Sequence, residues 1–499
     1  MLGQISHALE YIQTNVGQGN EVVEGILKHT RKEETLFEPF PMADLWLHLH
    51  TAVSLLNCMD LKGAEARIQE IAPMLEQLPS WARSLYHGQR ARMLLIRKDL
   101  EHALYEIKRA LYFSKKSMNR LIHANGQVIF AQICSKMGRN KEAVQYLDHA
   151  RHIIVQTDCR SHLALVWLLE AQFAFEQGDD HGGLELLRKA FIMAREGGYV
   201  FGLLDDPTAT IRMCERALEE GIEVEHVRTI IRRRGLVPDK PPIHIEDWPW
   251  AVKIYTLGRF SLVRNDEMVE FSRKAQQKPL ALLKALIALG GRGIKEEKLS
   301  EILWPDADGD MAHQSFDTTL YRLRKLLGRP EALIVRDGRV TLDNRYCWVD
   351  VWAFERLLGQ ADELRKQGET NRARQSTEKA IVLYRGHFLA GECNDPWIVT
   401  PTERMKSSFF KSASWLGRYL GEAGDWEQAA EYYERFLQLD ECREDFYRLL
   451  MVCYDNLGRK SDALSVYQRC RRTLSSLHGM MPSPETETVR GSIFSEKIP

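Results

Sequence analysis

Apolar residues recur at helical spacing over residues 316–327, and polar residues occupy the opposite face. At about 100° per residue, one stripe carries Phe316, Leu320, Leu323 and Leu327. The other face carries Gln314, Thr318, Tyr321 and Lys325, with Arg322 at its flank. We expect a helix that packs on a core and presents donors and positive charge on its outer side. Such a helix fits the major groove of DNA, but an ordinary surface helix with a solvated basic face has the same pattern.

A predicted hairpin follows this helix. Two short apolar runs, Leu333–Val335 and Val340–Leu342, are separated by Asp337-Gly338, a strong two-residue turn signal. Arg336 and Arg339 flank the turn, so both charges are expected near its tip. Over 322–345 basic residues outnumber acidic ones seven to three, whereas the whole chain has 68 basic and 69 acidic residues. The basic excess is therefore local, which is typical of a nucleic-acid contact surface.

The residues before this helix complete a small α+β unit. Strands are predicted at Val252–Leu257 and Phe260–Arg264, with a short third strand at Glu270–Phe271. Helices are predicted at Pro279–Leu289 and Lys295–Leu303. Strands, three helices and a hairpin, in this order, predict a winged helix.

Residues 252–345 resemble the winged-helix domain of OmpR/PhoB-type response regulators, and more closely the same domain in the Streptomyces antibiotic regulatory protein family. The residues that carry the resemblance are Leu257-Gly258-Arg259-Phe260, the leucine-rich first helix, Leu299–Pro305 and Leu320–Leu327. In that family the third helix enters the major groove and the wing contacts the flanking backbone. The resemblance implies DNA-facing roles for Gln314, Ser315, Thr318, Tyr321, Arg322 and Lys325 on the helix, and for Arg336 and Arg339 on the wing. Tyr321 departs from the basic or small residue of many relatives.

Residues 350–495 resemble the bacterial transcriptional activator domain that follows this winged helix in the same family. The matching segments are Val349-Asp350-Val351, Tyr384–Leu389, Trp397-Ile398, Glu403-Arg404 and Pro482–Thr486. Independently of the resemblance, Gly424–Ala429 recurs as Gly458–Ala463, and Tyr433 recurs as Tyr467, both at an offset of 34 residues. This is the tetratricopeptide period, and such repeats bury a core by stacking while leaving a concave face for partners.

Four similar segments near the N-terminus step by 39, 40 and 40 residues. They begin at Met59, Lys98, Gly138 and Gly178, and each opens an amphipathic helix, for example Ala143–Ile153 or Leu184–Ala194. We expect a helical solenoid, similar in spacing to the superhelical sensor region of MalT-like regulators. It is either a sensor or docking region, or a scaffold without a ligand. No phosphate-loop motif occurs, so the nucleotide-hydrolysing domain of those relatives lies outside this chain or is absent.

The predicted fold is mainly α, with two tetratricopeptide-like helical repeat blocks flanking an α+β winged-helix domain. The expected domains are a helical repeat region at 1–236, a proline-rich linker at 237–250, the winged helix at 251–346 and the activator domain at 347–495. The linker has four prolines in fourteen residues, so it should be partly extended. Arg232–Arg234 is expected to cap a helix end rather than touch DNA.

Motifs for other chemistry are weak. The segment Asp306–Asp310 begins like a calcium loop, but its sixth and twelfth positions are Met311 and Asp317 instead of Gly and Glu, so a helix start is preferred. His48 and His50 diverge on a helix and cannot share a metal. Aromatic residues Trp426, Tyr432 and Tyr433 are better explained by repeat packing than by a binding box. We therefore predict no cofactor, no metal and no enzymatic activity.

Composition suggests a cytoplasmic protein. No run of eighteen apolar residues and no signal peptide occurs, and the nine cysteines are dispersed without a Cys-x-x-Cys pair, as expected for reduced thiols. The predicted function is sequence-specific DNA binding by a transcriptional activator. Its predicted partners are double-stranded promoter DNA, RNA polymerase or another copy of the chain, and an effector or protein on the N-terminal repeats. The alternative is a repeat scaffold whose winged helix mediates protein–protein contacts; the local basic excess favours DNA.

Overall fold

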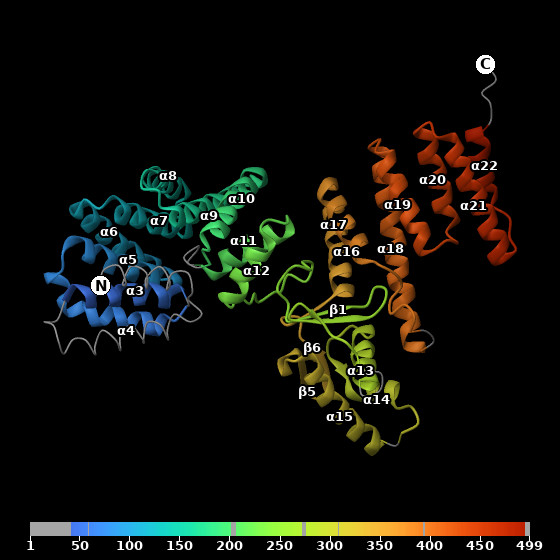
Figure 1. Cartoon of the computed structure of the whole chain (residues 1–499), viewed down its shortest axis with the longest axis horizontal. Coiled ribbons are helices and arrows are strands. Elements are labelled where there is room, and N and C mark those ends of the chain that lie inside the picture. Colours follow the sequence, from blue (N-terminus) through green and yellow to red (C-terminus); the bar gives the residue numbers. More distant parts are fainter. Residues whose placement is uncertain are drawn as a thin grey trace. The chain divides into compact units, whose positions relative to one another are not determined.

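The computed structural model describes residues 41–57, 59–200, 206–271, 276–307, 309–392 and 395–494. Its contacts divide the chain into two compact units. Unit 1 comprises residues 1–239 and 247–249, and unit 2 comprises 240–246 and 250–499. Helices dominate both units, and a small sheet region lies in unit 2 (Figure 1), which confirms the predicted mainly α fold class. In the described ranges, every helix is too short or too polar to cross a membrane.

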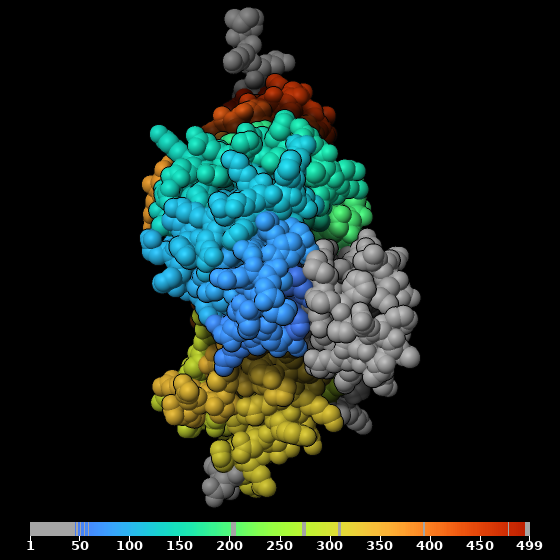
Figure 2. Space-filling model, turned by 90° about the vertical axis from the view of Figure 1, so that its left-hand side faces the viewer, coloured from blue at the N-terminus to red at the C-terminus, as the bar shows by residue number. Residues whose placement is uncertain are grey.

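Unit 1 is a stack of antiparallel helix pairs. Its helices are α3 (Pro41–Asn57), α4 (Leu61–Ile71), α5 (Ser80–Ile96), α6 (Leu100–Ser117), α7 (Arg120–Lys136), α8 (Asn140–Gln156), α9 (Arg160–Glu176), α10 (Asp180–Gly197), α11 (Pro207–Glu219) and α12 (Val224–Arg233). In Figure 2 the outer face of the first repeats, in blue to cyan, is a continuous packed surface.

The repeated segments mark the turns within the pairs. Met59, Lys98, Gly138 and Gly178 all have a positive φ, between 62° and 82°, which ends one helix and reverses the chain. The next residue often caps the following helix; the Asp99 carboxylate, for example, accepts the backbone N–H of His102. Ala64, Ala103 and Ala143 are then fully buried, because neighbouring helices approach closely there. The repeat predicted from the sequence is thus a turn, a cap and a small buried residue.

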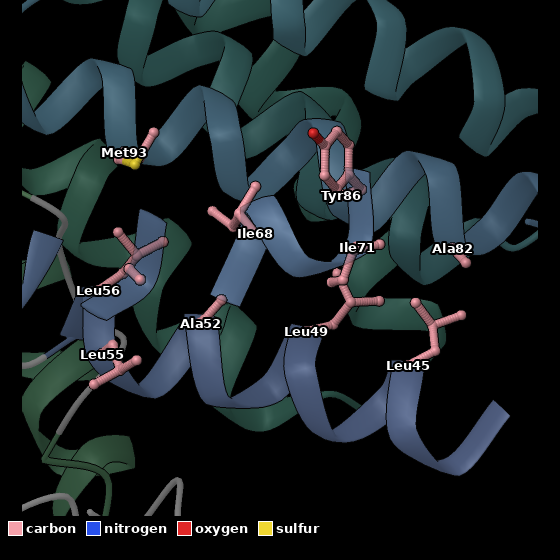
Figure 3. Close-up of a cluster of buried hydrophobic side chains, with 11 residues drawn as sticks. Leu45, Leu49, Ala52, Leu55, Leu56, Ile68, Ile71, Ala82, Tyr86 and Met93 are labelled. Atoms are coloured by element: carbon pink, nitrogen blue, oxygen red, sulfur yellow. The ribbon is translucent and has the colours of Figure 1, made fainter. Parts of the chain in front are cut away.

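The first three helices show how the core forms. Leu45 and Leu49 of α3, Ile68 of α4, and Tyr86 and Met93 of α5 belong to one buried cluster (Figure 3). At the other end of unit 1, α12 finishes with Arg232 and Arg233 in its last turn, and Gly235 has a φ of 58°. Basic side chains suit this negative helix end, which agrees with the cap interpretation.

Unit 2 begins with a four-stranded sheet of order β3-β2-β1-β7. Its strands are β1 (Val252–Tyr255), β2 (Ser261–Arg264), β3 (Glu267–Met268) and β7 (Cys347–Val349). The third strand was expected at Glu270–Phe271, and this position is wrong. Asn265 and Asp266 have φ values of 51° and 67°, so the chain turns directly after β2 and pairs three residues earlier. Strand β7 pairs in parallel with β1 and was not predicted.

Three helices and a second sheet follow, in the arrangement expected for a winged helix. They are α13 (Gln277–Ala288), α14 (Glu296–Leu303), α15 (Gly309–Leu327), and a sheet of order β4-β6-β5 with β4 (Ile294–Lys295), β5 (Leu333–Arg336) and β6 (Arg339–Leu342). The predicted helices and hairpin are therefore present, and β4 adds a third strand beside the wing.

The proline-rich segment is non-helical, as predicted. Its residues 240–246 belong to unit 2 and are held there by hydrogen bonds. Trp250 is 3% exposed, and its indole N–H donates to the Ile245 carbonyl at 2.9 Å. The indole of Trp348, in β7, donates to the Ile243 carbonyl at 2.9 Å. Residues 240–246 therefore form a strap fixed to the first sheet.

The rest of unit 2 is helical. Its helices are α16 (Asp350–Lys366), α17 (Thr370–Leu383), α18 (Pro396–Glu422), α19 (Trp426–Leu439), α20 (Glu444–Asn456), α21 (Lys460–His478) and α22 (Pro484–Phe494). The repeated residues have equivalent places: Gly424 and Gly458 have positive φ, and Ala429 and Ala463 are fully buried. Tyr433 lies so close to Gly417 that a methyl group there would sit 2.1 Å from its hydroxyl oxygen. This aromatic therefore serves repeat packing.

A buried carboxylate joins the winged helix to the helices behind it. Asp350 is the first residue of α16 and is 1% exposed. Its oxygens accept the backbone N–H groups of Thr256 and Leu257, each at 2.7 Å, and the Thr256 hydroxyl at 2.6 Å. It also accepts the Val351 N–H at 2.8 Å. Burial raises the pKa of Asp350 to about 6, whereas the four donors act in the opposite direction because they stabilise the ionised carboxylate.

Backbone contacts continue this junction. The Leu389 N–H donates to the Thr256 carbonyl at 2.7 Å, and the Ala390 N–H donates to the Gly258 carbonyl at 2.9 Å. Gly258 has a φ of 117°, and its Cα lies 3.2 Å from where a side chain on Gly386 would begin. Two glycines are needed here because the backbones touch.

We expect Asp350→Ala to destabilise unit 2 by about 3 kcal/mol or more, because it leaves several buried N–H groups unpaired. Asp362→Ala is the matched control on the same helix, where an exposed ion pair with Arg365 should contribute less than about 1 kcal/mol. Hydrogen exchange of the β1 amides measures both effects. Equal protection of these amides in the two variants would contradict the role of the junction.

Candidate nucleic-acid interface

Helix α15 divides sharply into a buried and an exposed face. Phe316, Leu323 and Leu327 are 0% exposed and Leu320 is 5% exposed, as the apolar stripe predicts. Gln314, Thr318, Tyr321, Arg322 and Lys325 are exposed, and Ser315 is half-buried. The structure thus places the six predicted helix residues on or beside one solvent-facing surface.

Local sequence explains why the helix forms here. It begins at Gly309, within the acidic segment that superficially resembles a calcium loop, and acidic residues suit a helix N-terminus. No group of three or more possible metal ligands occurs among the residues with described positions. Helix α13 packs against α15 with an almost wholly apolar sequence, including buried Leu282, Leu283 and Leu286. The exposed face of α15 is therefore presented by a rigid apolar support.

The wing is a tight hairpin. Its register pairs Arg336 with Arg339 across the turn. Asp337 and Gly338 have φ values of 51° and 64°, as a type I′ turn requires, which confirms the turn predicted from this dipeptide. Both arginines are exposed, but Arg339 also donates from Nη1 to the Gly293 carbonyl at 2.9 Å. Arg339 is therefore anchored over the wing, whereas Arg336 extends from its tip region without such a bond in the described part of the chain.

Some basic residues of this region already contact other groups of the chain. Arg345 binds Asp343 at 2.6 Å. Burial alone would raise the pKa of Asp343, but the hydrogen bonds from Arg345 outweigh it and the pKa is lowered. Arg329 lies over the Tyr346 ring, and Arg324 donates to the Leu333 carbonyl at 3.4 Å.

Three cations are left for a partner. Within the described residues, Arg322, Lys325 and Arg336 form no ion pair with an acidic side chain. Two lie on the exposed face of α15 and one lies on the wing. Binding of these three charges by a partner would break no ion pair among the described residues.

One basic residue beside α15 was not predicted from the sequence as part of this surface. Arg264, at the end of β2, donates to the Leu326 carbonyl near the end of α15 at 3.3 Å. It lines a hollow of about 820 Å³ together with Arg322, Lys325, Glu267 and Glu270. Arg264 is far from α15 in the sequence, and only the folded sheet brings it beside the helix. No sequence pattern therefore indicated this position.

Comparison with known proteins identifies the helical region of unit 2. Residues 349–494 match the family model of the bacterial transcriptional activator domain. Regulatory protein AfsR of Streptomyces griseus is 26% identical over 261 residues, covering 52% of this chain and 26% of that protein. AfsR of Streptomyces coelicolor is 25% identical over 257 residues, covering 50% and 25%. The chain thus spans about a quarter of the length of these relatives.

The solved structures that match include Mycobacterium tuberculosis EmbR in complex with a low-affinity phosphopeptide, at 20% identity and a TM-score of 0.40 over 49% of this chain and 65% of EmbR. NprR in complex with its cognate peptide NprX has 12% identity and a TM-score of 0.33 over 96% and 98%. The activator-domain match and the AfsR relatives confirm the predicted resemblance to regulators of the Streptomyces antibiotic regulatory protein type. The matched relatives are regulatory proteins, and the matched family model does not include the winged helix.

We expect Phe316→Ala to destabilise the winged helix by about 3–5 kcal/mol, because it empties a fully buried aromatic site. Tyr321→Ala should change stability by less than about 0.5 kcal/mol, since this side chain is 68% exposed on the same helix. Hydrogen exchange of the α15 amides gives both values. A large loss in Tyr321→Ala would mean that the outer face also packs on protein.

Proposed function

We propose that this protein is a sequence-specific DNA-binding transcriptional activator, and that unit 2 binds promoter DNA through α15 and the wing. One observation carries the proposal. The exposed face of α15 and the adjoining wing carry Arg322, Lys325 and Arg336 without acidic partners in the described structure, while the opposite helix face is completely buried.

The roles follow from chemistry and position. A helix of this width fits the major groove, where Arg322 can donate to guanine and Gln314 can bond adenine. Ser315, Thr318 and Tyr321 offer hydroxyl groups along the same surface, and Lys325 suits a phosphate. On the wing, Arg336 and the anchored Arg339 suit the flanking backbone.

The remaining parts supply contacts beyond DNA. The junction at Asp350 holds the activator helices to the winged helix through buried hydrogen bonds. These helices would therefore present a fixed surface to RNA polymerase or to a second copy of the chain. The repeats of unit 1 would bind an effector or a protein.

The second candidate is a scaffold whose winged helix binds protein. Exposed Tyr321, in the middle of the basic face, is compatible with it, because tyrosine is common in protein interfaces. Salt dependence separates the two candidates. Contacts to DNA phosphates make log K fall linearly with log salt, and promoter-DNA affinity that barely changes with salt would contradict the DNA proposal.

Arg322→Ala should weaken binding to the preferred site by roughly 1–3 kcal/mol and relax specificity there, if its guanidinium reads a base. Binding curves on the mapped site and on single-base variants measure this. Arg372→Ala is the control, because it removes an exposed arginine on α17 that pairs with Glu369. Equal behaviour of the two variants would remove α15 from the interface.

Arg336→Ala should weaken binding to all DNA sequences about equally and lower the salt slope by about 1, because a wing arginine neutralises a phosphate. Fluorescence anisotropy at several salt concentrations gives the slope. An altered base preference with an unchanged slope would instead assign Arg336 to base reading.

A further inference from the structure

Unit 1 contains a small, partly open cavity that lies outside the proposed DNA-binding surface. It lies where the ends of α5, α7 and α9 meet the start of α11, and its volume is about 250 Å³. Its lining includes Leu95, Ile96, Gln132, Ser135, Lys136, Leu169, Gln172, Phe173, Asp206 and Pro207. These residues come from successive repeats, so the cavity is a product of their stacking.

Most of the wall is apolar. Leu95, Leu169 and Phe173 are buried, and Ile96 and Pro207 are half-buried. A wall of this kind favours the hydrocarbon part of a ligand by removing it from water.

One buried polar side chain in the wall has no partner within the described protein. The Gln132 side chain is 8% exposed, lines the cavity and has no hydrogen bond to the described protein. A ligand carbonyl or amide could therefore form a hydrogen bond with this side chain. Gln172 has the equivalent position one repeat later, and its Nε2 donates to Glu176 at 2.8 Å. Of these two glutamines, only Gln132 is therefore left to bond a ligand through its whole amide.

The polar side of the cavity carries one ion pair and the exposed Lys98. The Lys136 ammonium lies 2.5 Å from the Asp206 carboxylate. Burial alone would raise the pKa of Asp206, but Lys136 and the capping N–H groups lower it. The Lys136–Asp206 pair has no net charge, and Lys98 is exposed to solvent, which screens its charge. The Ser135 hydroxyl adds one more hydrogen-bonding group beside Gln132.

We propose that this cavity is a binding site for a small, uncharged amphipathic molecule with an apolar body and a carbonyl or carboxamide end. The polar end bonds the Gln132 amide and the Ser135 hydroxyl, and the apolar body lies against Leu169 and Phe173. The cavity volume of about 250 Å³ lies just below the range typical of pockets for drug-sized ligands, so we expect a smaller molecule. The site goes beyond the proposed DNA binding and does not depend on it.

Two probes of similar size test the site on the full chain. 3-Phenylpropionamide has the carboxamide end, and butylbenzene has only the apolar body. Saturation-transfer NMR should show saturable binding of the amide with a dissociation constant on the order of millimolar, as expected for so small a ligand. Absence of saturable amide binding would overturn the proposal.

Two variants locate the binding. Gln132→Leu should weaken the amide at least fivefold and leave butylbenzene unchanged or tighter, because only the polar anchor is lost. Ser135→Trp should abolish binding of both probes by filling the cavity. Gln127→Leu is the matched control, since Gln127 lies on the same helix, is 5% exposed and does not line the cavity. Thermal melting establishes that each variant is folded. Amide binding that survives both cavity variants, or is lost equally in the control, would contradict the site.

Discussion

The arrangement of unit 2 depends on a buried charge that cannot be left unpaired. The Asp350 carboxylate lies at the start of α16, and its hydrogen-bond acceptors are satisfied only when the end of β1 is beside it. A buried ionised group without these donors would be far more costly than the hydrogen bonds are favourable. The carboxylate therefore favours one packing of the winged helix against α16.

The winged helix can be stable and still bind a partner, because different side chains serve these two roles. The support for α15 comes from the apolar residues of α13 and from its own buried stripe, so stability does not draw on the exposed side chains. Arg322, Lys325 and Arg336 can thus contact a partner without loss of packing in the winged helix. Arg339 is intermediate, because its bond to the Gly293 carbonyl serves the wing while its charge remains exposed.

Features set by neighbouring residues were predictable from the sequence, and features set by distant ones were not. The amphipathic pattern located α15, and Asp337-Gly338 located the wing turn. The spacing of Gly138 and Gly178 located turns of the solenoid. By contrast, β7 is too short to have a pattern of its own and exists through its pairing with β1. Arg264, Asp350 and Gln132 gain their importance from contacts that only the folded chain creates.

The parallel pairing of β1 with β7 has a consequence for how this protein can be divided. Strand β7 follows the wing in the chain, yet it completes the sheet that begins at Val252. A fragment that stopped at residue 346 would contain every strand and helix of the conventional winged helix but would expose the edge of β1. Unpaired strand edges recruit other chains, so such a fragment would tend to aggregate. Excised DNA-binding fragments of this protein should therefore extend past Ala390, where the backbone contacts with Gly258 end.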